Sequence, residues 1–320
     1  MRNNILDFLK LVRFKNLFII IIMNVFIKMF IINKLVQINA LNSFYFCIYL
    51  TTLILIIAGG YIINDIHDVE IDKINKPKEI IVSSKISTTT AWKIYYLLNI
   101  FAITCGVLLV IKLDKFELFS FFLFFILLLW LYSNKYKKTF LLGNLQVSFL
   151  TSLSIITLAI FDLFPIYNWT FIKSSYVFYL IIIYAIFCFF TTLIREIIKD
   201  LEDMSGDSFY NSNTLAIKYG KRKTKKVLYT LTTYTLILIV FVQYLLFKKV
   251  SKYNIDFQIS DEKLFYFSCI LIITIAIQIQ FILFLKKLIY ANENNDYTYL
   301  SKLCKIIMIT GILSMPFITF

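Results

Sequence analysis

The sequence is poor in charge and in the side chains that usually bind transition metals. Charged residues make up 16% of its 320 positions, where a soluble domain of this size would carry about a quarter. It has one histidine, His67, and its five cysteines are scattered with no pair at metal-ligand spacing. These absences exclude a histidine- or cysteine-based metal centre, and we interpret the cysteines as small buried side chains.

Long apolar stretches fill most of the chain. Hydrophobic residues make up 60% of the sequence, and stretches of about 17 to 25 such residues recur along its whole length, as is typical of membrane-spanning helices. We therefore expect an all-α, polytopic membrane protein. The nine candidate spans are 16–34, 44–63, 90–111, 116–132, 143–164, 174–195, 227–247, 264–285 and 303–320.

The basic residues indicate an orientation for these spans. With the N-terminus inside, most of the 33 basic residues fall in the inner segments, as the positive-inside rule requires. The pattern predicts an integral, multi-pass membrane protein, in the cell inner membrane if the organism is bacterial, with a cytoplasmic N-terminus. The net charge of +14 is thus chiefly a topology signal, and we expect no nucleic-acid partner because the charge is spread over loops between spans.

Two acidic motifs stand out against this apolar background. The stretch from Asp65 reads D-I-H-D-V-E-I-D, and the stretch from Asp200 reads D-L-E-D-M-S-G-D. Both follow the pattern D-x-x-D-x-x-x-D, and each comes directly after an apolar span. Two solvated loop faces would explain the acids but not their matched spacing, so the pair indicates a shared chemical role.

The spacing suggests magnesium and phosphate chemistry. Positions i, i+3 and i+7 of a helix share one face, so we expect three carboxylates of each motif to point the same way. Such close like charges repel unless a cation lies among them, and Mg²⁺ prefers carboxylates together with waters and substrate phosphates. Lys73, Lys76 and Arg195 flank the motifs and are candidate phosphate contacts, although the positive-inside rule alone would place basic residues there.

These motifs resemble those of the UbiA-type intramembrane prenyltransferases. That family carries N-D-x-x-D-x-x-x-D after its second span and a second Asp-rich motif after its sixth, and here the equivalents are Asn64–Asp72 and Asp200–Asp207. R-F-K-N at Arg13–Asn16 is similar to the family's R-P-x-N, with Phe14 in place of Pro. Y-S-N-K-Y-K-K-T-F-L-L-G-N at Tyr132–Asn144 is similar to its Y-S-x-x-x-K…G-N stretch. The similarity covers most of the chain.

The resemblance implies a single membrane domain over residues 1–320, with nine helices around a central cavity capped by Asp-rich cytoplasmic loops. It also implies that Mg²⁺ is the cofactor, and that the partners are a prenyl diphosphate donor, a lipophilic acceptor and membrane lipid. Implied roles follow residue by residue. Asn64, Asp68 and Asp72 bind one ion, Asp203 and Asp207 bind the other, and Asp65 and Asp200 support them. Lys135 or Lys137 and Arg195 contact the diphosphate, Tyr132 orients the substrate or stabilises the developing cation, and Asn16, Lys73, Lys76 and Asn144 complete the substrate-binding set.

Within the family, the second motif narrows the choice of acceptor. R-E-I-I-K-D-L-E-D-M-S-G-D, followed by N-T-L and Gly220, resembles the geranylgeranylglycerol-phosphate geranylgeranyltransferase branch. Glu79 stands where that branch typically has a basic residue, and Ser84 where it has glycine.

Three alternatives remain open. An aromatic prenyltransferase of quinone biosynthesis, acting on 4-hydroxybenzoate or a dihydroxynaphthoate, belongs to the same class, as does a haem farnesyltransferase. A cation-binding polytopic transporter belongs to a different class. A transporter would more often place its charges near the middle of the spans, whereas the two acidic motifs come at span ends.

Overall fold

The computed structural model describes residues 2–75, 77, 80–167, 175–210, 212–256 and 261–318. Nine helices within these ranges are long and apolar enough to cross a membrane, which confirms the expected all-α, multi-pass architecture. They extend over Phe14–Leu35, Ser43–His67, Thr88–Leu113, Phe116–Asn134, Leu142–Leu163, Tyr176–Glu202, Leu215–Lys248, Asp261–Tyr290 and Asn294–Phe317.

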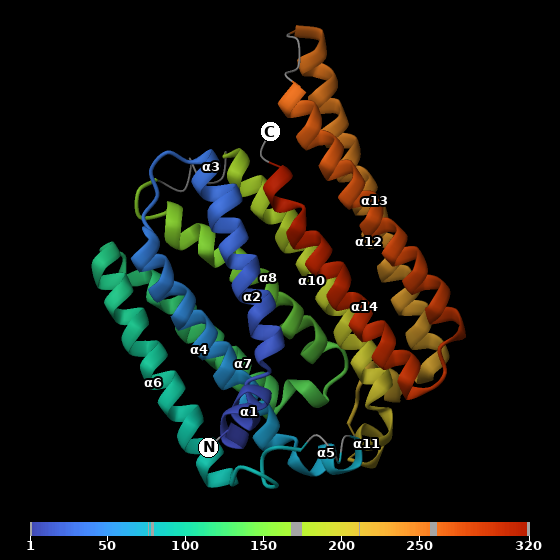
Figure 1. The fold of residues 1–320 in the computed structure, drawn as a ribbon. Helices are drawn as coiled ribbons and strands as arrows, with labels where there is room; N and C mark the ends of the chain where they lie inside the picture. The colour runs from blue at the N-terminus through green and yellow to red at the C-terminus, as the bar shows by residue number, and fades with distance from the viewer. Residues whose placement is uncertain are drawn as a thin grey trace.

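The helices form a bundle whose two chain ends lie at opposite ends (Figure 1). In chain order the helices are α1 (Arg2–Leu11), α2 (Phe14–Phe26), η1 (Ile27–Ile32), α3 (Asn33–Leu35), α4 (Ser43–His67), α5 (Val69–Asn75), α6 (Thr88–Leu113), η2 (Phe116–Leu118), α7 (Phe119–Asn134), η3 (Tyr136–Lys138), α8 (Leu142–Leu163), α10 (Tyr176–Glu202), α11 (Met204–Phe209), α12 (Leu215–Asp256), α13 (Asp261–Tyr290), α14 (Asn294–Leu313) and η4 (Met315–Phe317). The short helices α1, α5 and α11 lie together at one end (Figure 1), which we call the motif end.

Polar side chains mark where three of the spans begin. Asn42, Ser87 and Ser175 each accept a hydrogen bond from the backbone N–H three residues later, at the starts of α4, α6 and α10. Such N-caps satisfy one of the donors that the first helical turn leaves unpaired. The long apolar runs therefore begin as helices at defined residues, and this sets the depth of the residues that follow.

Close packing on α4 depends on two adjacent glycines. A Cβ atom on Gly60 would lie 2.9 Å from a methyl carbon of Leu129 on α7, and one on Gly59 would lie 2.9 Å from the side-chain nitrogen of Asn99 on α6. Both neighbours would have to move, because the helices approach closely only where the side chain is missing. The pair thus holds α6 and α7 against the helix that carries the first acidic motif.

A buried ion pair lies near the end of the bundle opposite the motif end. Lys28, in the wide turn η1, donates to Asp162 of α8 at 2.5 Å, and the exposed fractions of the two side chains are 5% and 0%. Asp162 also accepts a hydrogen bond from the backbone N–H of Leu41 at 2.8 Å. This one carboxylate therefore joins η1, α8 and the segment before α4.

Several spans extend further than the sequence predicted, and the extensions of the sixth and the ninth matter for the site. The sixth was expected to end at residue 195 but continues to Glu202 as part of α10. The ninth was expected to begin at 303 but begins at Asn294 with a capping box between Glu293 and Asp296. Charged residues that hydropathy assigned to loops are consequently held on rigid helices.

Candidate active site

Each acidic motif lies where a long helix gives way to a short one. Asp68 ends α4 with φ −94° and ψ −1°, and Asp203 ends α10 with φ −96° and ψ 8°. Their backbone N–H groups donate to the carbonyls of Asn64 and Lys199, at 3.0 and 2.8 Å. Each motif therefore spans two helices and not one, because both helices break at the middle carboxylate, although the three carboxylates of each motif line the same space. Asp65 and Asp200 also lie within helices and not in loops.

This shared geometry creates an electrostatic preference for cations. The last turn of a helix exposes carbonyl oxygens and carries the negative end of the helix dipole. At Asp68 and Asp203 that negative end coincides with carboxylates, and the helices α5 and α11 keep Asp72 and Asp207 beside them. Two such helix ends facing one cavity attract positive charge.

The cavity has a volume of about 900 Å³ and extends from the motif end into the bundle. Most residues predicted to form the site line its wall; these are Asn16, Asn64, Asp65, Asp68, Asp72, Tyr132, Lys137, Asn144, Arg195, Asp200, Asp203 and Asp207. Its inner part is lined mainly by apolar side chains, among them Ile20, Met23 and Met315. The cavity thus combines a charged end with an apolar interior.

Several of the motif carboxylates already have partners. Asp65 accepts from Arg13 at 2.8 Å, and Asp200 accepts from the side-chain nitrogen of Asn144 at 3.0 Å. Asp68 forms an ion pair with Lys137, and the same carboxylate oxygen accepts from Asn64 at 2.6 Å.

The ion pairs keep two basic side chains outside the spans, Lys137 and Arg13, in their charged form. Burial is the largest single influence and lowers the pKa of Lys137, but the charge of Asp68, its hydrogen bond and the nearby Tyr132 together raise it more, so the net pKa lies above the usual range. Burial also lowers the pKa of Arg13, while the charge of Asp65 raises it. The net pKa of Arg13 is again above its usual range. Both side chains are therefore cationic at any physiological pH.

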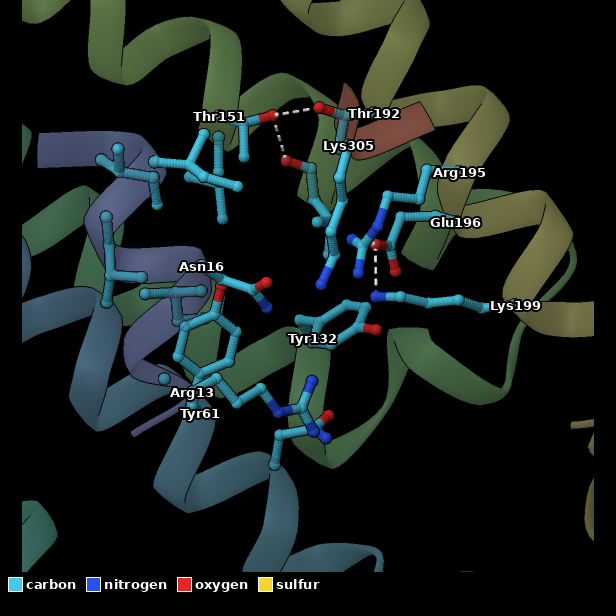
Figure 2. A pocket seen from close by; sticks show the side chains of 18 of the residues that line it. Arg13, Asn16, Tyr61, Tyr132, Thr151, Thr192, Arg195, Glu196, Lys199 and Lys305 are labelled. Atoms are coloured by element: carbon cyan, nitrogen blue, oxygen red, sulfur yellow. Dashed lines mark hydrogen bonds and ion pairs between the residues drawn. The ribbon is translucent and has the colours of Figure 1, made fainter. Parts of the chain in front are cut away.

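A second group of charges, on α10, was only partly anticipated. Arg195 and Lys199 both contact Glu196, at 3.0 and 2.6 Å, and all three line the cavity (Figure 2). Sequence reasoning identified Arg195 and missed the other two. The spacing i, i+1, i+4 would have placed Lys199 near Arg195 had the helix been extended to Glu202.

The predicted lysines divide into those at the cavity and those elsewhere. Lys73 forms an exposed pair with Glu70 at 2.6 Å and does not line the cavity. Lys135 is exposed at the end of α7 and does not line the cavity, whereas Lys137 in the next turn does, together with its neighbour Lys138. The structure thus gives Lys73 and Lys135 no place at the cavity wall. Lys76 lies outside the described residues.

The donor set is suited to magnesium. The side-chain oxygen of Asn64 is buried and accepts no hydrogen bond from the described part of the chain, which leaves a hard oxygen ligand available beside Asp68. Within the same residues no three carboxylate, histidine or cysteine side chains converge closely enough to hold an ion alone. Magnesium usually takes one or two carboxylates and completes its shell with waters and substrate phosphates, so this arrangement fits an ion that arrives with a phosphate ligand.

One side chain joins the two motif segments. The side-chain oxygen of Asn75, the last residue of α5, accepts hydrogen bonds from the backbone N–H of Gly206 at 2.7 Å and from the hydroxyl of Ser205 at 3.1 Å, both on α11. A Cβ atom at Gly206 would lie 2.6 Å from the Asn75 side chain. Glycine therefore permits this contact, which we call the α5–α11 clasp.

Comparison with known proteins places this arrangement in a family. A model of the UbiA prenyltransferase family matches residues 35–253. Digeranylgeranylglyceryl phosphate synthase of Saccharolobus solfataricus is 42% identical over 175 residues, which is 54% of this chain and 56% of that protein. The enzyme of the same name from Methanococcus aeolicus is 36% identical over 176 residues, again 54% and 56% of the two chains. The matched region thus spans just over half the length of these relatives.

Two solved structures share the fold over nearly the whole chain. A structure reported for digeranylgeranylglyceryl phosphate synthase in membranes has a TM-score of 0.64 at 24% identity and covers 98% of each chain. A UbiA homologue from Archaeoglobus fulgidus, bound to GPP and Mg²⁺, has a TM-score of 0.60 at 14% identity and covers 97% of this chain and 99% of its own. At these identities the likeness concerns the fold.

Proposed function

The chain belongs to the UbiA prenyltransferase family, and from this premise we propose that it transfers a prenyl group from a prenyl diphosphate to a lipophilic acceptor within the membrane. The observation that carries the proposal is the meeting of two matched carboxylate helix ends, Asp68 and Asp203, over one cavity with a charged end and an apolar interior. A prenyl diphosphate needs both environments, the charged end for its diphosphate and the apolar interior for its hydrocarbon tail.

We propose further that the acceptor is geranylgeranylglycerol phosphate. Support comes from the curated relatives that match half of the chain, which are named for digeranylgeranylglyceryl phosphate synthesis, and from the residues of the second motif. We also propose that the motif end faces the cytoplasm, as the basic residues indicate, and that residues 1–320 form a single domain. Contacts between α14 and both α2 and α10 support the last point.

The proposed chemistry assigns a task to each group of residues. Magnesium, held by Asn64, Asp68 and Asp72 on one side and by Asp203 and Asp207 on the other, would supply the charge that stabilises the leaving diphosphate. Asp65 and Asp200 support those residues through Arg13 and Asn144, their partners in the structure.

The basic residues act on the same leaving group from the protein side. Lys137 and Arg195 line the cavity and contact the diphosphate oxygens as the allylic C–O bond breaks, which is preorganised electrostatic stabilisation. The acceptor hydroxyl then attacks the allylic carbon, and its proton passes to an oxygen of the released diphosphate as the ether C–O bond forms.

The allylic cation must be kept from water until the acceptor attacks. The ring of Tyr132 lies within the cavity among the charged side chains (Figure 2), where its face can stabilise a neighbouring cation by about 1–2 kcal/mol. Asn16 lies on the opposite wall and contacts the hydroxyl of Tyr61. It orients the substrate from that side.

Purified protein in lipid nanodiscs tests the proposal directly. With geranylgeranyl diphosphate and Mg²⁺ we expect a prenylated product with geranylgeranylglycerol phosphate and none with 4-hydroxybenzoate or 1,4-dihydroxy-2-naphthoate, as judged by mass spectrometry. Chelation by EDTA should abolish turnover, and added Mg²⁺ should restore it, since the oxygen donors of the site require a hard cation. Product with an aromatic acceptor alone would assign the chain to quinone biosynthesis, and silence with all three acceptors and several donor lengths would contradict prenyl transfer.

Widening the α5–α11 clasp should slow catalysis without unfolding the bundle. In Gly206→Ala the new methyl group meets the Asn75 side chain, so α5 and α11 must separate and the two sets of carboxylates move apart. Because small displacements of positioned groups are costly, we expect kcat to fall roughly tenfold or more.

Ser208→Ala, an exposed change on the same short helix, is the matched control and should retain full activity. Unaltered kcat in the Gly206→Ala variant, at equal yield of folded protein, would show that the clasp does not position the motifs.

A further inference from the structure

Helices α10 and α14 run in opposite directions, and one hydrogen bond sets their register. The hydroxyl of Thr298 donates to the carboxylate of Glu202 at 2.7 Å, with α10 ending and α14 beginning at the motif end (Figure 1). Arg195 and Lys305 each lie seven residues further into the bundle, which is about 10 Å along either helix. Residues seven apart share a helix face, so these two cations occupy the same level on facing sides.

Lys305 points into the cavity and has no counter-ion there. Both Arg195 and Lys305 line the cavity, and the Lys305 ammonium extends toward its centre beside Arg195 and above Tyr132 (Figure 2). Throughout the described ranges no carboxylate forms an ion pair with Lys305 and no group hydrogen-bonds to its side chain. On the neighbouring wall a single carboxylate, Glu196, serves both Arg195 and Lys199.

The positive-inside rule alone does not explain why Lys305 lies within a membrane-spanning helix. The residue lies eleven positions after the start of α14, deep enough to be costly in a membrane, where an ionisable group normally marks a substrate path. The positive charges of Arg195, Arg13 and Lys15 act on it unfavourably, and the carboxylate that acts favourably, Glu196, is the one already paired with Arg195 and Lys199. Lys302, one turn earlier, is exposed and meets the positive-inside rule without entering the cavity.

The proposed reaction makes a bare ammonium at this level unfavourable. An allylic cation forms next to the diphosphate, and an uncompensated positive charge beside it would raise the barrier that Tyr132 and the diphosphate lower. The carboxylate end that serves the diphosphate lies further out, since Asp203 is eight residues beyond Arg195 on the chain, about 12 Å along a helix. A second anion, carried by the other substrate, would neutralise Lys305.

We propose that Lys305, facing Arg195, binds the anionic headgroup of the acceptor. The inference rests on the proposed prenyl transfer and adds to it a residue that selects acceptors bearing a phosphate or carboxylate group. A phosphate monoester offers several oxygens to the Lys305 ammonium, which acts as a point charge, while Arg195 on the facing side stays with the diphosphate. An uncharged acceptor of the same length leaves Lys305 unpaired and binds weakly.

The test compares Lys305→Met with Lys305→Arg and with Lys302→Met as the matched control, all in nanodiscs. We expect the acceptor KM of Lys305→Met to rise at least tenfold while the donor KM stays within twofold, Lys305→Arg to recover most of the loss, and Lys302→Met to match the wild type. A rise in the donor KM alone, or unchanged kinetics in Lys305→Met, would overturn the proposal.

A binding measurement keeps this test separate from the proposed function. Geranylgeranylglycerol phosphate and its dephosphorylated form are titrated in turn against wild-type protein and Lys305→Met. Wild-type protein should bind the phosphate form at least tenfold more tightly, and Lys305→Met should lose that preference. Equal binding of both lipids by the wild type would overturn the proposal that Lys305 binds the acceptor phosphate. If only an aromatic acid is prenylated, the same shift in acceptor KM assigns Lys305 to its carboxylate. If no acceptor is prenylated, the proposed function fails, while the lipid titration still decides whether Lys305 binds an anionic headgroup.

Discussion

Replacing Asp68 and Asp203 together by asparagine should abolish prenyl transfer while the protein still inserts and folds. Both residues end long helices at the cavity, and asparagine keeps their size and much of their hydrogen bonding while removing two charges that would hold the metal. Loss of one preorganised electrostatic contact commonly costs 10²–10³-fold in kcat. For the pair we expect turnover to fall by roughly a thousandfold or more, measured as diphosphate release with geranylgeranyl diphosphate and Mg²⁺.

Asp114→Asn is the matched control for this double variant. Asp114 is exposed just after α6, where its backbone is left-handed with φ 53°, and asparagine tolerates that conformation well. The control should keep wild-type turnover and the same yield of monodisperse protein. Turnover by the Asp68→Asn/Asp203→Asn protein within tenfold of the wild type would refute the proposed roles of both motifs.

The largest loss of stability should come from Asp162→Asn. The change leaves the Lys28 ammonium in the apolar interior without its counter-ion, while the new amide oxygen still accepts from the N–H of Leu41. Breaking a buried pair by removing one partner typically costs about 3–5 kcal/mol. The free energy of unfolding, measured by SDS titration of protein in mixed micelles, should fall by that amount.

A double variant separates the charge from the packing. Lys28→Met together with Asp162→Asn removes both charges, so we expect it to be more stable than Asp162→Asn alone. The pair lies about 27 Å along α8 from Asn144, eighteen residues away, so protein that folds should keep its KM values. Equal stability of the single and double variants would show that the ion pair is not what Asp162 contributes.

The sequence predicted the spans and most of the site, but from two different features, the apolar runs and the spacing of the acidic motifs. Long apolar runs specify membrane helices locally, and the motif spacing placed Asn64–Asp72 and Asp200–Asp207 beside one cavity, as the structure does. The helix ends were harder, because charged residues such as Lys199 lower the hydropathy of a window although the backbone stays helical. That is why the α10 cluster appeared to lie in a loop.

The local sequence pattern could not predict the register between helices that are far apart in the chain. Lys305 fell near the start of the predicted ninth span, 303–320, and it is the pairing of Thr298 with Glu202 that brings it level with Arg195. The clasp between Asn75 and Gly206 likewise joins positions more than a hundred residues apart. Such contacts depend on which faces pack together, and a single sequence does not contain that information in any one window.

Under the proposed function, the shared oxygen of Asp68 would make metal and donor bind cooperatively. In the structure this oxygen serves Lys137 and Asn64 at once, so a metal ion held by Asp68 would compete with Lys137 for it, and the ammonium would then be available to a phosphate. A donor that engages Lys137 first makes the same oxygen easier for the ion to occupy. Thermodynamic linkage requires the two effects to be equal, so the factor by which Mg²⁺ tightens donor binding is the factor by which the donor tightens Mg²⁺ binding.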